Sequence, residues 1–383
     1  MKRLSSVFII LSGFLFMLIS CRNDLTTNSP DNTSSKPQSV HNRGPEASNV
    51  GTVTVFSTGL NNPRGLKFGP DGYLYVAEAG IGGTDSTTNA CDQVIPPIGP
   101  YKGSVNGSRI SRISPSGQRT TYVDNLPSSQ TSPVTGGLKM GVADVAFINH
   151  TLYALLAGAG CSHGVESIPN GIIRINPDMS WTMIANLSAW QQSHPVAHPE
   201  EEDFEPDGTW YGMINVKDNL YAVEPNHGEM VRVTPSGQIN RVIDVSATQG
   251  HIVPTVVAYN GNFFIGNLHT FPIVAGSSNI FKVTPSGQIK VWAGGFTTIL
   301  GILIDQHRRI YVLENTAVSG PGPMPNSGKI IRLDNSGQRV VIADGLNLPT
   351  GMTFGPDGNI YVSALGFGAP DGAGEVLKVT IPD

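Results

Sequence analysis

Oxygen-bearing side chains recur at one position of a repeated pattern in this chain. The position follows a short apolar run such as LYV or FFI, where a strand is expected to end, and it holds Glu78, Glu224, Asn267 and Glu314. Oxygen ligands that converge from several strands can bind Ca²⁺ or another divalent ion, and Glu78, Asn267 and Glu314 form the candidate set. In the alternative, each side chain bonds the loop backbone of the neighbouring blade, as buried polar groups require. Recurrence at one repeat position favours this structural role.

Other polar residues are expected near the same strand ends. They are Arg64, Asp144, Asn226, His227, His269 and Asn315, and with the four residues above they form the predicted ligand-binding rim. The sequence contains no P-loop or CxxC motif and no GxGxxG after a parallel strand. The stretch GCSHG at 160–164 has the GxSxG spacing, but it lies within the loop expected at 157–170, so no nucleophile elbow is predicted. The sequence therefore identifies no catalytic nucleophile.

The composition indicates an all-β protein that is dense in turns. The chain has 383 residues with 45 Gly and 28 Pro, and 14% of its residues are charged, against about 25% in an average domain. The net charge of −5 gives no electrostatic reason to expect a nucleic-acid partner.

The first 20 residues have the pattern of an export signal. A short basic start precedes an apolar core at residues 7–19, which is too short to span a bilayer comfortably. The sequence LISC at residues 18–21 resembles the lipobox of bacterial lipoproteins, which implies cleavage before Cys21 and lipid attachment to its thiol. In the alternative, the signal is cleaved in the ordinary way and Cys21 is incidental.

Residues 21–50 are expected to form a flexible tether, because they are rich in Asn, Ser, Thr and Pro and almost lack large apolar residues. The lipid at Cys21 would hold an exported, monomeric protein on a membrane of the cell envelope. Arg22 stands where many lipoproteins of the inner membrane have Asp, which favours the outer membrane if the source is Gram-negative.

Two hairpin patterns alternate along residues 51–383. The first has an apolar strand, a turn with Asp, Asn or Gly, and a second strand; its copies cover 66–76, 145–155, 213–223, 256–265, 302–313 and 352–362. The second has the form IFKVTPSGQIKV, with copies that begin at 110, 172, 230, 280 and 330 and half a copy at 376–381. Six units of four strands predict a six-bladed β-propeller of four-stranded antiparallel blades.

The two ends of the chain predict how the ring closes. The sixth unit lacks its fourth strand, and residues 54–63, TVFSTGLNNP, align without gaps to residues 340–349, VVIADGLNLP. The N-terminal strand is therefore expected to complete the last blade, which removes exposed sheet edges. Two separate domains of three units each would leave this match unexplained.

Loop lengths distinguish the two faces of the predicted ring. Turns within the hairpins are short and uniform, whereas the connections on the opposite face are long and irregular; they include 79–107, 128–140, 157–170, 188–205, 268–279, 315–328 and 365–374. Long, varied loops on a rigid scaffold usually carry function. We call this side the top face and expect the site there, around the central channel.

Cys91 and Cys161 both lie in loops of the top face, in neighbouring units. Because an exported protein meets an oxidising compartment, we expect a disulfide between them that holds the longest loop. Two free thiols are the alternative, since sequence alone does not supply the geometry.

Several motifs resemble the ScyD/ScyE family. They are NPRGL at 62–66, GPDG at 69–72, YVAEAG at 75–80, VPT at 253–255, GNL at 266–268 with FP at 271–272, GFT at 295–297 and LPTG at 348–351. More distantly, the units resemble propellers of the NHL and SMP-30/gluconolactonase types. The ScyD/ScyE family is named after scytonemin-pigment gene clusters and has no settled activity, so the resemblance implies a fold and no catalytic residue. The chain departs from it at 223–228, VEPNHG, in the third unit.

Two functions from different classes remain open. The first is an envelope-anchored binding propeller whose partner is a protein, a glycan or a small molecule. The second is a metal-dependent hydrolase of the lactonase type, with Glu78, Asn267 and Glu314 around one ion. A role in assembling a pigment or polysaccharide export system rests on the family context alone.

Overall fold

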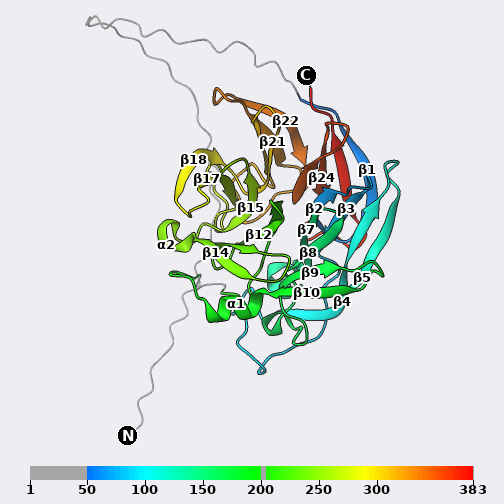
Figure 1. Ribbon diagram of the computed structural model, residues 1–383, viewed down its shortest axis with the longest axis vertical. Coiled ribbons are helices and arrows are strands. Elements are labelled where there is room, and N and C mark those ends of the chain that lie inside the picture. The colour runs from blue at the N-terminus through cyan, green and yellow to red at the C-terminus, as the bar shows by residue number, and fades with distance from the viewer. Residues whose placement is uncertain (1–49, 200–203, 383) are drawn as a thin grey trace, which may run out of the picture. The chain divides into compact units, whose positions relative to one another are not determined.

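A computed structural model describes residues 50–199 and 204–382. Within these residues the strands form six antiparallel sheets that are arranged around a common centre (Figure 1). The six-bladed β-propeller predicted from the repeats is confirmed. The expected export signal and tether, residues 1–20 and 21–50, lie outside the described residues except for Val50, and so does the lipidation site Cys21.

Each blade contains two successive hairpins. Blade 1 is β2 (Pro63–Phe68), β3 (Leu74–Glu78), β4 (Lys102–Ile113) and β5 (Arg119–Gln130), with β6 (Lys139–Met140) added at its edge. Blade 2 is β7 (Val142–Ile148), β8 (Thr151–Leu156), β9 (Gly171–Ile175) and β10 (Trp181–Asn186). Blade 3 is β11 (Gly212–Val216), β12 (Asn219–Glu224), β13 (Glu229–Val233) and β14 (Ile239–Asp244).

The remaining blades follow the same order. Blade 4 is β15 (Pro254–Tyr259), β16 (Phe263–Asn267), β17 (Ser278–Val283) and β18 (Ile289–Phe296). Blade 5 is β19 (Ile299–Ile304), β20 (Ile310–Glu314), β21 (Gly328–Leu333) and β22 (Arg339–Leu346). Blade 6 is β23 (Gly351–Phe354), β24 (Ile360–Ala364), β25 (Gly374–Val379) and β1 (Val53–Leu60).

The repeated turns share their hydrogen bonds as well as their sequence. In the first hairpin of blade 1, the Asp71 carboxylate accepts the Tyr73 N–H at 3.2 Å and the Tyr75 hydroxyl at 2.8 Å. Asp357 accepts the equivalent groups of Asn359 and Tyr361 in blade 6, at 3.2 and 3.1 Å. The side chain therefore stabilises the tight turn in both copies.

The N-terminal strand closes the ring as predicted. β1 lies beside β25, in blue next to red in Figure 1, and the pairing runs antiparallel from Val53 opposite Val379 to Leu60 opposite Gly374. The rings of Phe56 and Phe68 each pack edge-on against Tyr361, with centroids 4.9 and 5.0 Å apart. Aromatic packing therefore joins the closing strand to the rest of blade 6, and Tyr361 joins blade 6 to blade 1.

The hydrophobic core is divided among the blade interfaces. Each buried cluster in the described part of the chain combines residues of two neighbouring blades. Between blades 6 and 1, for example, Leu60 and Val376 pack with Leu66, Leu74 and Val76. Because apolar faces of adjacent sheets bury one another, each blade depends on its neighbours for stability.

Some elements of the top face were not predicted. The β4–β5 hairpin of blade 1 begins at Lys102 and ends at Gln130, so strand replaces part of the loops expected at 79–107 and 128–140. The connections also contain short helices: α1 (Leu187–Ser193), α2 (Ser246–Gln249), η1 (Pro133–Thr135) and η2 (Cys161–His163). Among the described residues, no helix is long and apolar enough to cross a membrane.

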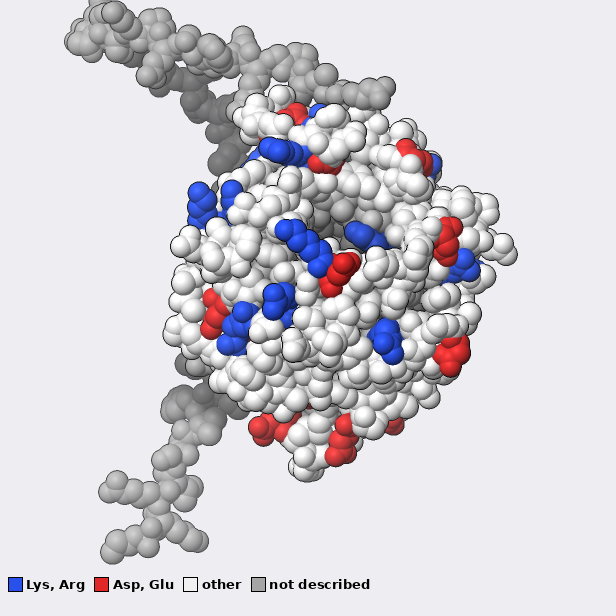
Figure 2. Space-filling model, in the orientation of Figure 1, with Lys and Arg blue, Asp and Glu red and all other residues white. Residues whose placement is uncertain are grey.

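Charged residues are sparse on the surface. Figure 2 shows side chains of both signs scattered over the face in view, which is hollowed near its middle. No extended basic patch is visible on this face, in agreement with the net charge of −5.

Candidate functional site

A cavity of about 460 Å³ lies among the top-face loops, and we call it the mouth cavity. Its wall contains the residues that directly follow the second strands of the first four blades: Ala79, Ala157, Pro225 and Leu268. Its aromatic lining consists of Tyr101, Trp210, Tyr211, Phe271 and Phe367. The propeller therefore forms a mainly apolar cavity at the end where its second strands meet.

Arg64 is the most buried cation of this cavity, with 7% of its surface exposed. Its Nη2 donates a hydrogen bond to the Lys139 carbonyl at 2.6 Å. Its guanidinium carbon lies 5.9 Å from the ring centroids of both Tyr211 and Phe367, within the range of cation–π contacts. Because Arg64 comes directly from β2, the scaffold holds its position at the edge of the channel.

A buried polar network supports one side of the mouth cavity. The Tyr101 hydroxyl donates to Glu205 Oε1 at 2.6 Å, and His163 Nε2 lies 3.5 Å from Glu205 Oε2. Ser129 Oγ lies 2.9 Å from His163 Nδ1. The Ser129 hydroxyl, the His163 ring and the Glu205 carboxylate therefore form a continuous chain of polar contacts. Both Ser129 and His163 are fully buried, and neither lines the mouth cavity. The network therefore stabilises the loops and does not present a nucleophile to a ligand.

Burial also sets the charge of this histidine. Loss of contact with water lowers the pKa of His163 to about 4, although Asp207 and the Gly208 carbonyl act in the opposite direction. His163 is therefore neutral near pH 7.

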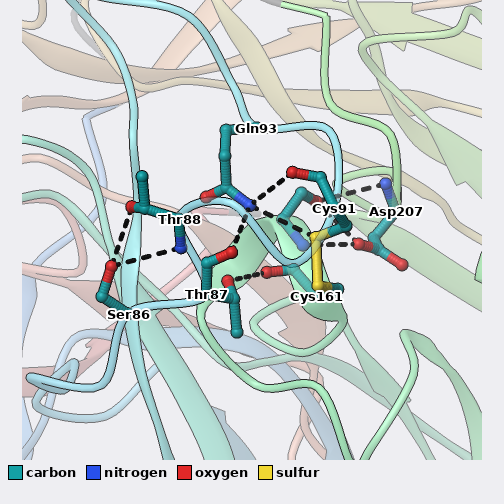
Figure 3. Close-up of a disulfide and its surroundings, with 8 residues drawn as sticks. Ser86, Thr87, Thr88, Cys91, Gln93, Cys161 and Asp207 are labelled. Carbon is teal, nitrogen blue, oxygen red and sulfur yellow. Dashed lines mark hydrogen bonds between the residues drawn. A yellow bond between two sulfur atoms is a disulfide. The ribbon is translucent and has the colours of Figure 1, made fainter.

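A disulfide joins Cys91 to Cys161 and fastens the loop that leads to the mouth cavity (Figure 3). Its Cα atoms lie 6.3 Å apart. The Thr87 hydroxyl donates to the Cys161 carbonyl, and the Gln93 side chain donates to the Cys91 carbonyl at 3.2 Å. Beside the bridge, Asp207 accepts the N–H of Ser162 at 2.8 Å. Because the same loop continues to Pro97, Ile98 and Tyr101, the bridge restrains one wall of the mouth cavity.

The recurring acids at the second-strand ends bond the backbone that enters their own blades. Glu78 accepts the N–H of Asn61 and the Nε–H of Arg109, the latter at 2.9 Å. Glu224 accepts the Thr209 N–H at 2.7 Å. These contacts are structural, as the sequence favoured for this position, but their partners lie in the connection that enters the same blade and not in a loop of the neighbouring blade.

Glu314 and Asn267 make equivalent contacts. Glu314 accepts the Thr297 N–H at 2.7 Å, and Asn267 donates to the Ile252 carbonyl at 2.8 Å. Burial raises the pKa of Glu314 to about 7. Among residues 50–199 and 204–382, no group of three or more His, Cys, Asp and Glu side chains has the arrangement of a metal site. A metal-dependent hydrolase with Glu78, Asn267 and Glu314 remains a prediction, which elemental analysis of the purified protein tests.

The structure brings only part of the predicted rim together. Arg64, Asn226 and His269 line the mouth cavity. Asp144 lies instead along a narrow channel cavity of about 70 Å³, where it accepts the N–H groups of Val145 and Met213 at 2.8 Å each.

The other predicted rim residues also lie outside the mouth cavity. His227 is buried, and its Nε2 atom lies 3.0 Å from the Glu205 carbonyl oxygen. It lines a second cavity of about 530 Å³. Asn315 donates to the Pro349 carbonyl at 2.8 Å. Glu78, Glu224, Asn267 and Glu314 line none of these three cavities.

The sequence reasoning missed the aromatic and apolar lining of the mouth cavity. Tyr101, Trp210, Tyr211 and Phe367 lie in or beside long connections without periodic pattern. One signal was present, since these large side chains stand in loops that are otherwise rich in Gly, Pro and polar residues.

Comparisons with known proteins show the fold. No family model and no protein with a curated function matches this sequence. A protein of unknown function from Bacteroides thetaiotaomicron is 11% identical with a TM-score of 0.54, over 86% of this chain and 75% of that chain. An oxidoreductase of the glucose dehydrogenase type from Thermus thermophilus is 14% identical with a TM-score of 0.51, over 86% and 99%. A gluconolactonase from Xanthomonas campestris is 9% identical with a TM-score of 0.50, over 86% and 89%.

Proposed function

We propose that this chain is a binding protein of the cell envelope and that its propeller holds a small organic ligand in the mouth cavity. The observation that supports this proposal is the cavity itself, whose volume of about 460 Å³ is within the range of roughly 300–1,000 Å³ that is usual for small-molecule sites. Its lining also has the usual composition of such sites, with many aromatic and apolar side chains and a few polar groups.

A small molecule suits this site better than a protein or a glycan. A protein partner needs an extended surface of about 800 Å² on each side, whereas the mouth cavity is a concavity bordered by loops of several blades. The aromatic rings of Tyr211 and Phe367 flank a single buried cation, Arg64, which favours a compact ligand with an apolar body.

A fluorescent apolar probe tests the proposal. N-phenyl-1-naphthylamine becomes fluorescent in apolar sites, and we expect the full-length protein to bind it at one saturable site. Leu138 lines the cavity, and Leu138→Trp should fill it and weaken binding at least tenfold. Val134→Trp is the matched control, because Val134 belongs to the same connection, is 81% exposed and does not line the cavity. Absence of saturable binding, or equal binding by both variants, would contradict the proposal.

We place the protein on a membrane through lipid at Cys21, on the strength of the lipobox-like sequence alone. Cys21→Ala should move the protein from the membrane fraction of its host to the soluble fraction. Retention of this variant on the membrane would refute lipid anchoring and would leave the ligand proposal unaffected.

A further inference from the structure

We infer that the mouth cavity selects an anionic ligand and that Arg64 is the residue that binds the anion. This inference rests on the proposed function, because it names the chemical class of ligand for the same site. It would apply to a molecule with an apolar body and one carboxylate or sulfonate group.

The first argument is the unbalanced charge of Arg64. In the described part of the chain, no carboxylate lies within ion-pair distance of its guanidinium, although only 7% of the residue is exposed. Its hydrogen bond to the Lys139 carbonyl uses a neutral acceptor and one of five N–H donors. A buried cation without an anionic partner is costly, and a bound anion would relieve this cost.

The second argument is the sign of the other charges around the mouth cavity. Lys139 also lines it, with its ammonium group bonded to the neutral Gln130 amide. Against these two cations, the described lining has one carboxylate, that of Glu205, which accepts the Tyr101 hydroxyl and lies beside the neutral His163. The described lining therefore has more uncompensated positive than negative charge, which attracts an anion.

The third argument is the position of the guanidinium between two aromatic rings. Tyr211 and Phe367 lie at equal distances of 5.9 Å from its central carbon, and the Tyr211 hydroxyl donates to the Thr350 carbonyl at 3.1 Å. These contacts hold a planar group with paired N–H donors, which matches the two oxygens of a carboxylate or sulfonate. The flanking rings would contact the apolar body of the same ligand.

Two probes with nearly the same ring system separate charge from shape. 8-Anilinonaphthalene-1-sulfonate has the naphthalene and phenylamine groups of N-phenyl-1-naphthylamine together with one sulfonate. We expect the full-length protein to bind the sulfonate probe at least tenfold more tightly than the neutral probe. Arg64→Met should abolish this preference, with weaker binding of the sulfonate probe and unchanged or tighter binding of the neutral one.

Two further variants keep the test decisive. Arg64→Lys retains the charge without the paired donors and should retain part of the preference, and Arg308→Met, at an exposed turn outside the lining of the mouth cavity, should retain all of it. Equal affinity of the unaltered protein for both probes would overturn the inference and leave the proposed function intact. If Arg64→Met weakened the binding of both probes equally, the inference would also be overturned, because Arg64 would then only support the cavity. If the unaltered protein binds neither probe, the proposed function itself is refuted.

Discussion

Removal of the Cys91–Cys161 disulfide should lower the free energy of unfolding by about 4 kcal/mol. The two cysteines are 70 residues apart in sequence. In the chain-entropy description, a crosslink that closes a loop of this length removes about 15 cal/mol/K of entropy from the unfolded chain, which is about 4 kcal/mol at 25 °C. Since a folded domain is usually stable by about 5–15 kcal/mol, the bridge should supply a large part of the stability.

Urea unfolding of the Cys91→Ser/Cys161→Ser double variant measures this contribution. Circular dichroism should show a lower midpoint, and a reducing agent should produce the same loss in the unaltered protein and none in the double variant. The third cysteine of the chain offers a control, since Cys21→Ser should leave the midpoint unchanged. A loss below about 1 kcal/mol in the double variant, or a further loss on its reduction, would refute the reasoning.

Three further substitutions test the packing and the charges of the ring. Gly65→Ala would place a Cβ atom 1.9 Å from Asp144 Oδ1 and should cost about 1–3 kcal/mol in urea unfolding, whereas Gly322→Ala, with open space around it, should be neutral. Burial raises the pKa of Glu314 from 4.5 to about 7, so the folded state binds the carboxyl proton of Glu314 more tightly than the unfolded chain does. The free energy of unfolding should therefore fall as pH rises from about 4.5 to 7, and Glu314→Gln should remove this part of the pH dependence. Arg241→Met should cost about 3–5 kcal/mol, because it removes the Nε–H that lies 2.6 Å from the fully buried side chain of Glu229; a loss below about 1 kcal/mol would contradict this.

The blades could be predicted because their signals are local. Gly237, Gly287 and Gly337 stand at the same place of three repeated turns, each with a positive φ between 82° and 86°, and such a turn fixes the hairpin around it. Ring closure was also predictable, because β1 copies the sequence of a fourth strand and must pair with the one sheet that lacks it.

The mouth cavity could not be predicted in this way, because its contacts join distant parts of the chain. Tyr101 bonds Glu205 over 104 positions, and Tyr211 bonds Thr350 over 139 positions. No period or spacing in a loop encodes such a contact. Repeat position identified Glu78 and Glu314 as important, but recurrence marks what every blade needs for its own structure, whereas a binding site uses what differs between blades.

Closure of the ring by β1 has a consequence for the order of folding. β1 begins at Val53 and its partner β25 ends at Val379, so the strand made first must wait for the strand made last. During synthesis β1 has an unpaired edge, and Leu60 lacks the Val376 partner with which it packs in the finished protein. Pairing of strands so far apart in the chain is slow and exposes edges to aggregation. Completion of blade 6 should therefore be a late step that completes the interfaces with both of its neighbours at once.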